Sequence, residues 1–167
     1  EQLVARSVER RRVHRADARE CRLEVHEIVE PVDQRTNTRL AAELQITQEY
    51  LGQSIDLAFL APMWREVLDA DTYANGKGTT IASIVDGSAK LQHPSVIAGV
   101  ANTGTDRNWT GHLLAQANWY AFGRLAWDHQ LADEKIADEW TRLTFGHDAT
   151  TVATINKMLL GSRETVV

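Results

Sequence analysis

The chain has little of what marks disulfide-rich, membrane-spanning or nucleic-acid-binding proteins. Its 167 residues include one cysteine, Cys21, so no internal disulfide can form, and we expect a reducing, cytoplasmic location. No apolar run approaches the roughly 20 residues that span a bilayer. The formal net charge of -5 argues against nucleic acid or an anionic membrane surface. We therefore expect no nucleic-acid partner and no membrane partner.

Motifs for cofactors and metals are also lacking. Three glycines near the centre of the chain are too far apart for a phosphate-binding loop, and four histidines have spacings that match no metal-ligand motif. These residues are Gly99, Gly104 and Gly111, and His93, His112, His129 and His147. We expect neither a cofactor nor a bound metal. The composition, 43% hydrophobic and 25% charged, is that of a soluble globular domain.

Residues 1–42 differ from the remainder of the chain. They contain no glycine, one proline (Pro31) and nine arginines, and their apolar residues follow neither a helical nor a strand period. A poorly ordered leader or marginal helix fits this composition better than a basic arm for nucleic acid. Translation of a shifted reading frame is a third interpretation that the protein sequence leaves open.

The stretch Val96–Asp128 combines a strand pattern, a polar loop and a helix pattern. The apolar run from Val96 to Ala101 predicts a buried strand. Residues 102–111 form a polar loop, after which apolar residues recur at helical spacing up to Leu125. In parallel α/β folds, ligands bind at the loops that follow the strands. The stretch therefore predicts a site, without specifying a reaction.

Polar and apolar residues alternate along Glu43–Tyr50, which predicts a second strand. Leu44 and Ile46 share one face, whereas Gln45, Thr47 and Glu49 share the other. A polar face that ends in a carboxylate suits the open end of a barrel, where Glu49 would serve as an acid or a base. The alternative is a structural acid at a strand end or in a salt bridge.

Most of the remaining chain has helical patterns. We expect helices over Ala61–Asp71, over a short segment capped by Thr79 and stopped by Gly87, from Asp133 to about Gly146, and from Asp148 or Thr150 to Gly161. Apolar residues at helical spacing predict the core. They include Ile81, Ile84, Val85, Ile136, Leu143, Val152, Ile155, Met158 and Leu159, and the tryptophans Trp119, Trp127 and Trp140.

Three blocks carry a resemblance to a known family: LQITQEYLGQ at 44–53, LAPMWREVLDADTYANGKG at 60–78, and VIAGVANTGTDRNWTGHLLAQANWYAFGRLAWD at 96–128. Together they resemble the xylan alpha-glucuronidases of glycoside hydrolase family 67, from about Glu43 to the C-terminus. Departures are minor, with Leu113 in place of an expected proline and Thr105 in place of an expected acid. The resemblance identifies a family; the activity of this chain is a separate question.

The resemblance implies an α/β fold: the last βα units of a (β/α)8 (TIM) barrel over residues 43–112, then the start of a helical C-terminal domain over 113–167. The structure would be mostly helical overall. A complete barrel needs about 250 residues. The chain is therefore interpreted as a fragment whose parent enzyme, by resemblance, is a homodimer.

The family's reaction is inverting hydrolysis of the alpha-1,2 bond between 4-O-methylglucuronic acid and xylose in xylooligosaccharides. By resemblance, Glu49 matches one of two carboxylates that activate water. The family's second carboxylate is an aspartate a little over two dozen residues earlier. Here that neighbourhood, Cys21–Val25, holds none, and Asp33 is not at a matching position. The proton donor would lie upstream, so we expect the isolated chain to be inactive.

The loop at 102–111 supplies the candidate substrate-binding residues Asn102, Arg107 and Trp109. A guanidinium group can grip the carboxylate of a glucuronic-acid-substituted xylooligosaccharide, and an aromatic plane suits the apolar face of a sugar ring. The structural alternative pairs Arg107 with Asp106 and packs Trp109 under the next helix. A different class of function, a non-catalytic sugar-binding or assembly module, also stays open.

Overall fold

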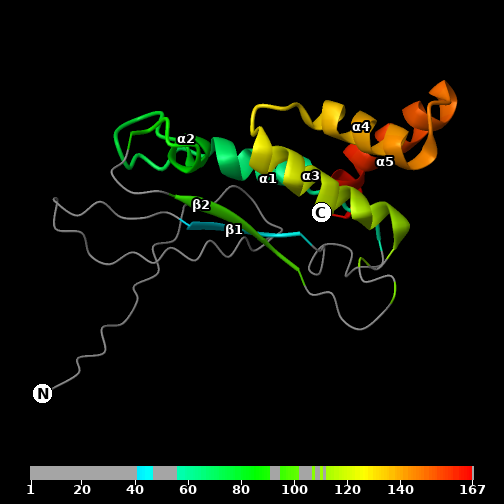
Figure 1. Cartoon of the computed structure of the whole chain (residues 1–167), viewed down its shortest axis with the longest axis horizontal. Helices are drawn as coiled ribbons and strands as arrows, with labels where there is room; N and C mark the ends of the chain where they lie inside the picture. Colours follow the sequence, from blue (N-terminus) through cyan, green and yellow to red (C-terminus); the bar gives the residue numbers. More distant parts are fainter. Residues whose placement is uncertain are drawn as a thin grey trace, which may run out of the picture.

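A computed structural model describes residues 41–46, 56–90, 95–101, 107, 110 and 112–166. The leader expected over residues 1–42 lies outside these ranges, apart from Ala41 and Ala42 in the first strand. The described part is mostly helical and contains two parallel strands (Figure 1).

Strands β1 (Ala41–Gln45) and β2 (Val96–Val100) form a parallel pair in which Ala41 faces Val96 and Gln45 faces Val100. The pairing continues for one more hydrogen bond, since the Ile46 N–H donates to Val100 O at 2.7 Å. Leu44 and Ile46 are buried and Glu43 is exposed, which confirms the alternation expected for this strand. The described strand runs to Gln45, and residues 47–50 of the expected strand lie outside the described residues.

The expectation that β2 is a buried strand is wrong for this chain. None of its five residues is buried, and Val96 is 56% exposed. All helices of the described part lie on one side of the sheet (Figure 1), and β2 pairs there only with β1. One face and one edge of an apolar strand are consequently left without a partner from the described residues.

Two helices separate the strands. Helix α1 (Ala61–Asp69) carries Pro62 in its first turn, where the missing N–H costs nothing, and it buries Trp64 and Leu68. The cap of helix α2 (Ile81–Val85) lies one residue later than expected, because Thr80 rather than Thr79 accepts a hydrogen bond from the Ser83 N–H. Parallel strands require a long connection of this kind.

A single 3-10 turn, η2 (Leu113–Ala115), leads into α3 (Gln116–Trp127), which is followed by α4 (Asp133–Phe145). Gly146 ends α4 with φ +92°, a left-handed conformation that suits glycine. Ile136 and Trp140 are buried as expected. Leu143 is 74% exposed, so its assignment to the core is wrong; Thr141 takes the buried position.

Helix α5 (Ala149–Val166) begins as expected, with the Asp148 carboxylate accepting from the Thr151 N–H at 2.8 Å. It runs through Gly161 instead of ending there, so the expected C-terminus is wrong. Met158 is exposed, and Ser162 is buried one turn after Leu159. A glycine inside a helix costs about 1 kcal/mol relative to alanine, and burial of the neighbouring Leu159 and Ser162 favours continuation of the helix.

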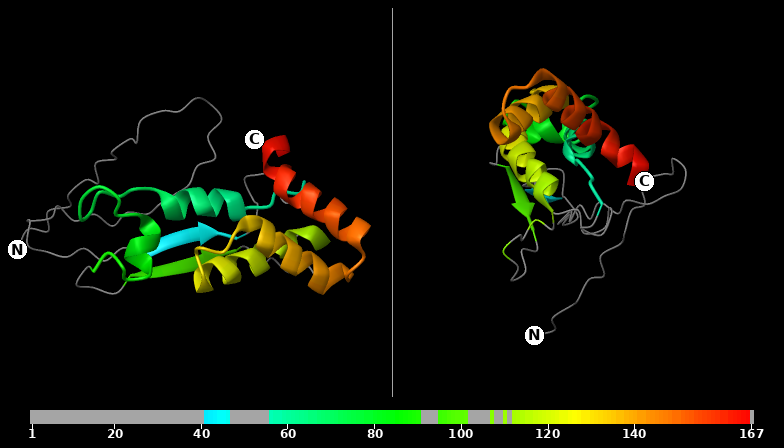
Figure 2. Two further views of the ribbon diagram at one scale, coloured as in Figure 1. Left: turned by 90° about the horizontal axis from the view of Figure 1, so that it is seen from above. Right: turned by 90° about the vertical axis from the view of Figure 1, so that its right-hand side faces the viewer.

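The core lies between the helices and the helix-facing side of the sheet, with α1 and α3 running along it (Figure 2). Its largest fully buried side chains are Trp64, Phe59, Leu60, Ile136, Leu159, Asn118 and Thr141. Trp140 belongs to the core and Trp119 packs against it, as expected. Trp127 is 87% exposed at the end of α3, so its expected core position is wrong. Within the described residues, every helix is too short or too polar to cross a membrane.

Candidate active site

Strands β1 and β2 end at the same edge of the sheet. Because β1 and β2 are parallel and in register up to Gln45 and Val100, the segments that follow them start side by side. The segment after β1 carries Glu49, and the segment after β2 carries Asn102, Arg107 and Trp109. Loops at the carboxyl ends of parallel strands are where such folds bind ligands and perform chemistry.

The described residues that follow these two segments, Asp56 and His112, are also in contact. The Nε2 atom of His112 lies 3.3 Å from the backbone oxygen of Asp56, and a carbonyl only accepts, so the imidazole donates this bond. Thr110, which is buried, donates its hydroxyl to His112 O at 3.1 Å. The described residues on either side of these two segments are therefore neighbours, Ile46 with Val100 and Asp56 with His112.

The predicted site residues fall mostly outside the described ranges. Glu49, Asn102 and Trp109 lie there, so their predicted roles stay predictions. Arg107 is described, and its side chain is exposed; its predicted role also stays a prediction. Asp106, its alternative partner, is outside the described residues.

A buried asparagine of α3, Asn118, forms hydrogen bonds with the backbone of residues 58–60, which precede α1. The Asn118 Nδ2 donates to Ala58 O at 2.9 Å, and its Oδ1 accepts from the Leu60 N–H at 2.9 Å. The side chain is almost completely inaccessible to solvent. Asn118 thereby satisfies two backbone groups that would otherwise be buried without partners.

The residue between these two contacts is held by α5. The Phe59 N–H donates to the Ser162 Oγ at 2.8 Å, and that hydroxyl donates onward to Leu159 O at 2.6 Å. Sequence reasoning missed Asn118 and Ser162. The available signal was their position: both are polar residues within the apolar stripe of an amphipathic helix, where an unpaired polar group is costly.

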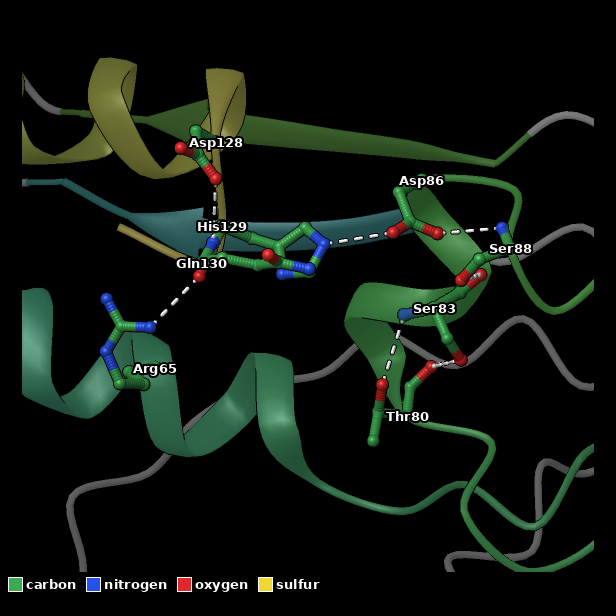
Figure 3. A network of polar contacts seen from close by, with 8 residues as sticks. All are labelled: Arg65, Thr80, Ser83, Asp86, Ser88, Asp128, His129 and Gln130. Carbon is green, nitrogen blue, oxygen red and sulfur yellow. Dashed lines mark hydrogen bonds and ion pairs between the residues drawn. The ribbon is translucent and has the colours of Figure 1, made fainter. Parts of the chain in front are cut away.

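A second polar network lies away from these loops. The Arg65 guanidinium of α1 pairs with Asp133 and donates to the backbone oxygens of His129 and Leu131. Figure 3 shows the bond from Arg65 to the backbone oxygen of His129, in the connection between α3 and α4, together with the contact of His129 with Asp86. Asp86 ends α2, which Figure 2 places beside the ends where both strands begin. The network therefore joins helices at the end of the sheet opposite the candidate site.

Another ion pair ties α5 to α1. The Arg163 guanidinium donates to both Glu66 carboxylate oxygens, at 2.7 and 3.0 Å. This bidentate hydrogen bond lowers the pKa of Glu66 despite partial desolvation. Among the described residues, no group of three His, Cys, Asp or Glu side chains is placed to hold a metal ion. The ion pairs that can be described are consistent with a structural role.

Comparison with known families assigns both parts of the chain. Residues 22–109 match the model of the glycosyl hydrolase family 67 middle domain, and residues 110–167 match the family 67 C-terminus. The junction falls between β2 and η2. The contacts of Asn118, Ser162, Arg163 and His129 therefore link the two matched regions.

Curated relatives carry one activity in their names. The chain is 45% identical over 127 residues to "Alpha-glucuronidase A" of Emericella nidulans and 42% identical over 125 residues to "Alpha-glucuronidase" of Hypocrea jecorina. A "Probable alpha-glucuronidase A" of Aspergillus niger is 41% identical over 126 residues. These alignments cover 76%, 75% and 75% of this chain, but 15% of each relative.

Proposed function

The chain belongs to glycosyl hydrolase family 67, and from that membership we propose that it is a segment of an alpha-glucuronidase that contributes Glu49 to catalysis. The observation that carries the proposal is the closeness of the described residues that flank the segments after β1 and β2. Ile46 is a neighbour of Val100, and Asp56 is a neighbour of His112. A carboxylate on one segment and sugar-binding residues on the other thus belong to one end of the sheet.

The proposed reaction is inverting hydrolysis of the alpha-1,2 bond between 4-O-methylglucuronic acid and xylose. Glu49 takes a proton from water as the water attacks the anomeric carbon. A carboxylic acid elsewhere in the complete enzyme protonates the departing xylose oxygen. An inverting pair of carboxyl groups is about 6.5–9.5 Å apart, which leaves room for that water.

Arg107, Trp109 and Asn102 are proposed to bind the uronic acid. The guanidinium forms a bidentate pair with the sugar carboxylate, the indole plane packs against the apolar face of the ring, and the carboxamide bonds a hydroxyl. The exposed position of Arg107 supports its part in this arrangement. A homodimeric and cytoplasmic parent enzyme is part of the same proposal, with the single Cys21 as support for the location.

A chimeric enzyme tests this function. The matching segment of the Emericella nidulans enzyme is replaced by the segment from this chain, and release of 4-O-methylglucuronic acid from aldouronic oligosaccharides is measured. Early proton NMR spectra should show the beta anomer first, as inversion at an alpha bond requires. The isolated 167-residue chain should release none, since the proton donor is supplied by the other part of the enzyme.

Variants of the chimera test the assigned roles. Glu49→Gln should lower kcat by about 10²–10⁴-fold with KM within a few-fold, because it removes proton transfer and keeps shape. Glu134→Gln, the same change at an exposed residue in the first turn of α4, is the matched control and should leave kcat unchanged. Arg107→Ala should raise KM, and Arg107→Lys should restore binding only in part. Near-normal turnover of Glu49→Gln would refute the assignment.

A further inference from the structure

Tyr73 combines an unfavourable backbone conformation with an exposed side chain. Its φ is +57°, in the left-handed region that a bulky residue rarely adopts. The side chain is 65% exposed, so packing does not compensate for this conformation. Asparagine or glycine would adopt the same conformation more readily. The fold therefore gives no reason for a tyrosine at this position, and backbone outliers of this kind gather at functional sites.

Hydrogen bonds within the loop hold Tyr73 in this conformation. The Asp71 carboxylate accepts from the Tyr73 N–H at 2.9 Å and from the Gly78 N–H at 2.7 Å. The Tyr73 carbonyl accepts from the Gly76 N–H at 3.2 Å, and the buried Thr79 donates its hydroxyl to Gly76 O at 2.7 Å. Both backbone polar groups of Tyr73 are therefore bonded, and its ring is presented on a fixed support.

A second residue with a left-handed backbone lies on the other side of α2. Lys90 has φ +54° and an exposed side chain. The Asn75 Nδ2 donates to Ala89 O at 3.3 Å, which ties the loop of Tyr73 to the segment that carries Lys90. Lys77, between two glycines of the same loop as Tyr73, is also exposed. One aromatic ring and two ammonium groups are thus exposed on two connected segments, which flank α2 at the end where both strands begin (Figure 2).

The charges of these two segments favour an anionic ligand. The acids are engaged by backbone groups: Asp71 accepts from two N–H groups of its own loop, and Asp86 accepts from the Ser88 N–H at 2.8 Å. Lys77 and Lys90, by contrast, form no ion pair with any other described residue. In a chain of net charge -5, this surface therefore offers two free cations beside an exposed ring.

We propose that Tyr73, Lys77 and Lys90 form a second binding site, for a xylan chain that carries uronic acid groups. The phenol ring packs against the apolar face of a sugar ring, and a tyrosine offers this area with little loss of conformational entropy. The two ammonium groups pair with uronate carboxylates of the chain. The choice of glycan rests on the proposed function, whereas the site is built from described residues alone. It lies at the end of the sheet opposite the candidate active site.

Tyr73→Asn in the chimeric enzyme tests the site, with affinity for glucuronoxylan measured by electrophoresis in gels that contain the polysaccharide. Asparagine suits the left-handed backbone and an exposed position, so Tm should rise by about 1–3 °C. Affinity for glucuronoxylan should fall about fivefold, while Tyr73→Trp should retain it within about twofold. A tyrosine that served only the fold would give the opposite result, a lower Tm and unchanged affinity.

Charge variants test the two lysines. Lys77→Gln and Lys90→Gln should each weaken binding of glucuronoxylan about two- to fivefold at low salt and less at high salt, because exposed ion pairs are screened. Neither should change the affinity for xylan from which the uronic acid groups have been removed, whereas Tyr73→Asn should weaken binding of both polymers. Lys157→Gln, the same change at an exposed lysine of α5, is the matched control and should leave both affinities unchanged.

Unchanged affinity of Tyr73→Asn for glucuronoxylan would overturn the proposed site. An effect of Lys157→Gln equal to those of Lys77→Gln and Lys90→Gln would overturn the assigned role of the two lysines. Failure of the proposed function has a different signature: a chimera that binds glucuronoxylan through Tyr73 but hydrolyses no aldouronic oligosaccharide would refute that function and leave the binding site intact. Where the chimera fails to fold, the same gels apply to the 167-residue chain.

Discussion

His129 and Asp86 join two helical connections that are 43 residues apart in sequence, with Nε2 of the imidazole 2.9 Å from Oδ2 of the carboxylate. Asp86 also accepts a hydrogen bond from the Ser88 N–H at 2.8 Å (Figure 3). The Ser88 bonds are the main cause that lowers the pKa of Asp86, and His129 lowers it further. The contact links the end of α2 to the connection between α3 and α4.

This contact predicts a loss of stability in acid. Because folding lowers the pKa of Asp86, its contribution is present above the unfolded-state pKa of about 3.9 and is lost as the pH falls through the folded pKa. Asp86→Asn should therefore lower the free energy of unfolding at pH 7, and the difference from the unsubstituted chain should disappear as the pH falls through the lowered folded-state pKa of Asp86. Urea unfolding followed by tryptophan fluorescence across this pH range measures the difference.

His129→Gln distinguishes the two causes of the lowered pKa of Asp86, the Ser88 bonds and the His129 contact. Glutamine offers Asp86 a neutral donor and leaves the Ser88 bonds, which are the larger cause, in place. Its loss of stability at pH 7 should be smaller than that of Asp86→Asn. A larger loss would show that the histidine, and not the turn at Ser88, dominates.

Ile136 and Leu143 should respond oppositely to truncation, although both were expected in the core. Ile136 is fully buried in α4, so Ile136→Ala should cost about 2–5 kcal/mol of unfolding free energy. Leu143 on the same helix is mostly exposed, so Leu143→Ala should change stability by less than about 0.5 kcal/mol. Denaturant midpoints of the two variants provide the comparison, and equal effects would contradict the placement of α4.

Replacement by alanine should have opposite effects on stability at Gly99 and at Gly123. A Cβ atom at Gly99 would overlap Ile46 Cδ1 and lie 2.8 Å from Phe122 Cε1, so Gly99→Ala should destabilise the chain by about 1–3 kcal/mol. Gly123 lies inside α3 with open space around it, and Gly123→Ala should stabilise by about 0.5–1 kcal/mol. Thermal melting of both variants gives the sign directly, and a stabilised Gly99→Ala would refute the close strand–helix approach.

The uncovered strand β2 predicts self-association of the isolated chain. Val96 is exposed on an apolar strand that has one partner in the described sheet, and such edges pair with other chains. Val96→Lys should lower the average molecular mass measured by light scattering at a given concentration. Tyr73→Lys replaces another exposed large side chain outside the sheet and serves as control. A monomeric wild-type chain would contradict this prediction.

Sequence reasoning located the elements well because their signals are local. The alternation around Leu44, the proline that opens α1 and the glycine that ends α4 each act within a few residues. The family resemblance is confirmed by the match to both family 67 regions. The interpretation of Glu49 as catalytic came from that resemblance and stays a prediction.

The errors concern which side chains are covered, which depends on partners outside the local pattern. Trp127 and Leu143 have the spacing of core residues, but each lies near the end of a helix, beyond the reach of the neighbouring layer. The opposite error was to overlook Asn118 and Ser162, which are polar but buried. Their burial is favourable only because backbone groups some 60 and 100 residues earlier need partners, and no local period encodes that need.

The bond between Phe59 and Ser162 spans 103 residues, which has a consequence for synthesis on the ribosome. At translation rates of about 5–20 residues per second, Phe59 emerges roughly 5–20 s before the hydroxyl that caps its N–H. The core around Phe59 therefore cannot close during most of that interval, and contacts of such long range also slow folding. The nascent chain exposes the segment after the Glu49 loop to chaperones and proteases until α5 has been made.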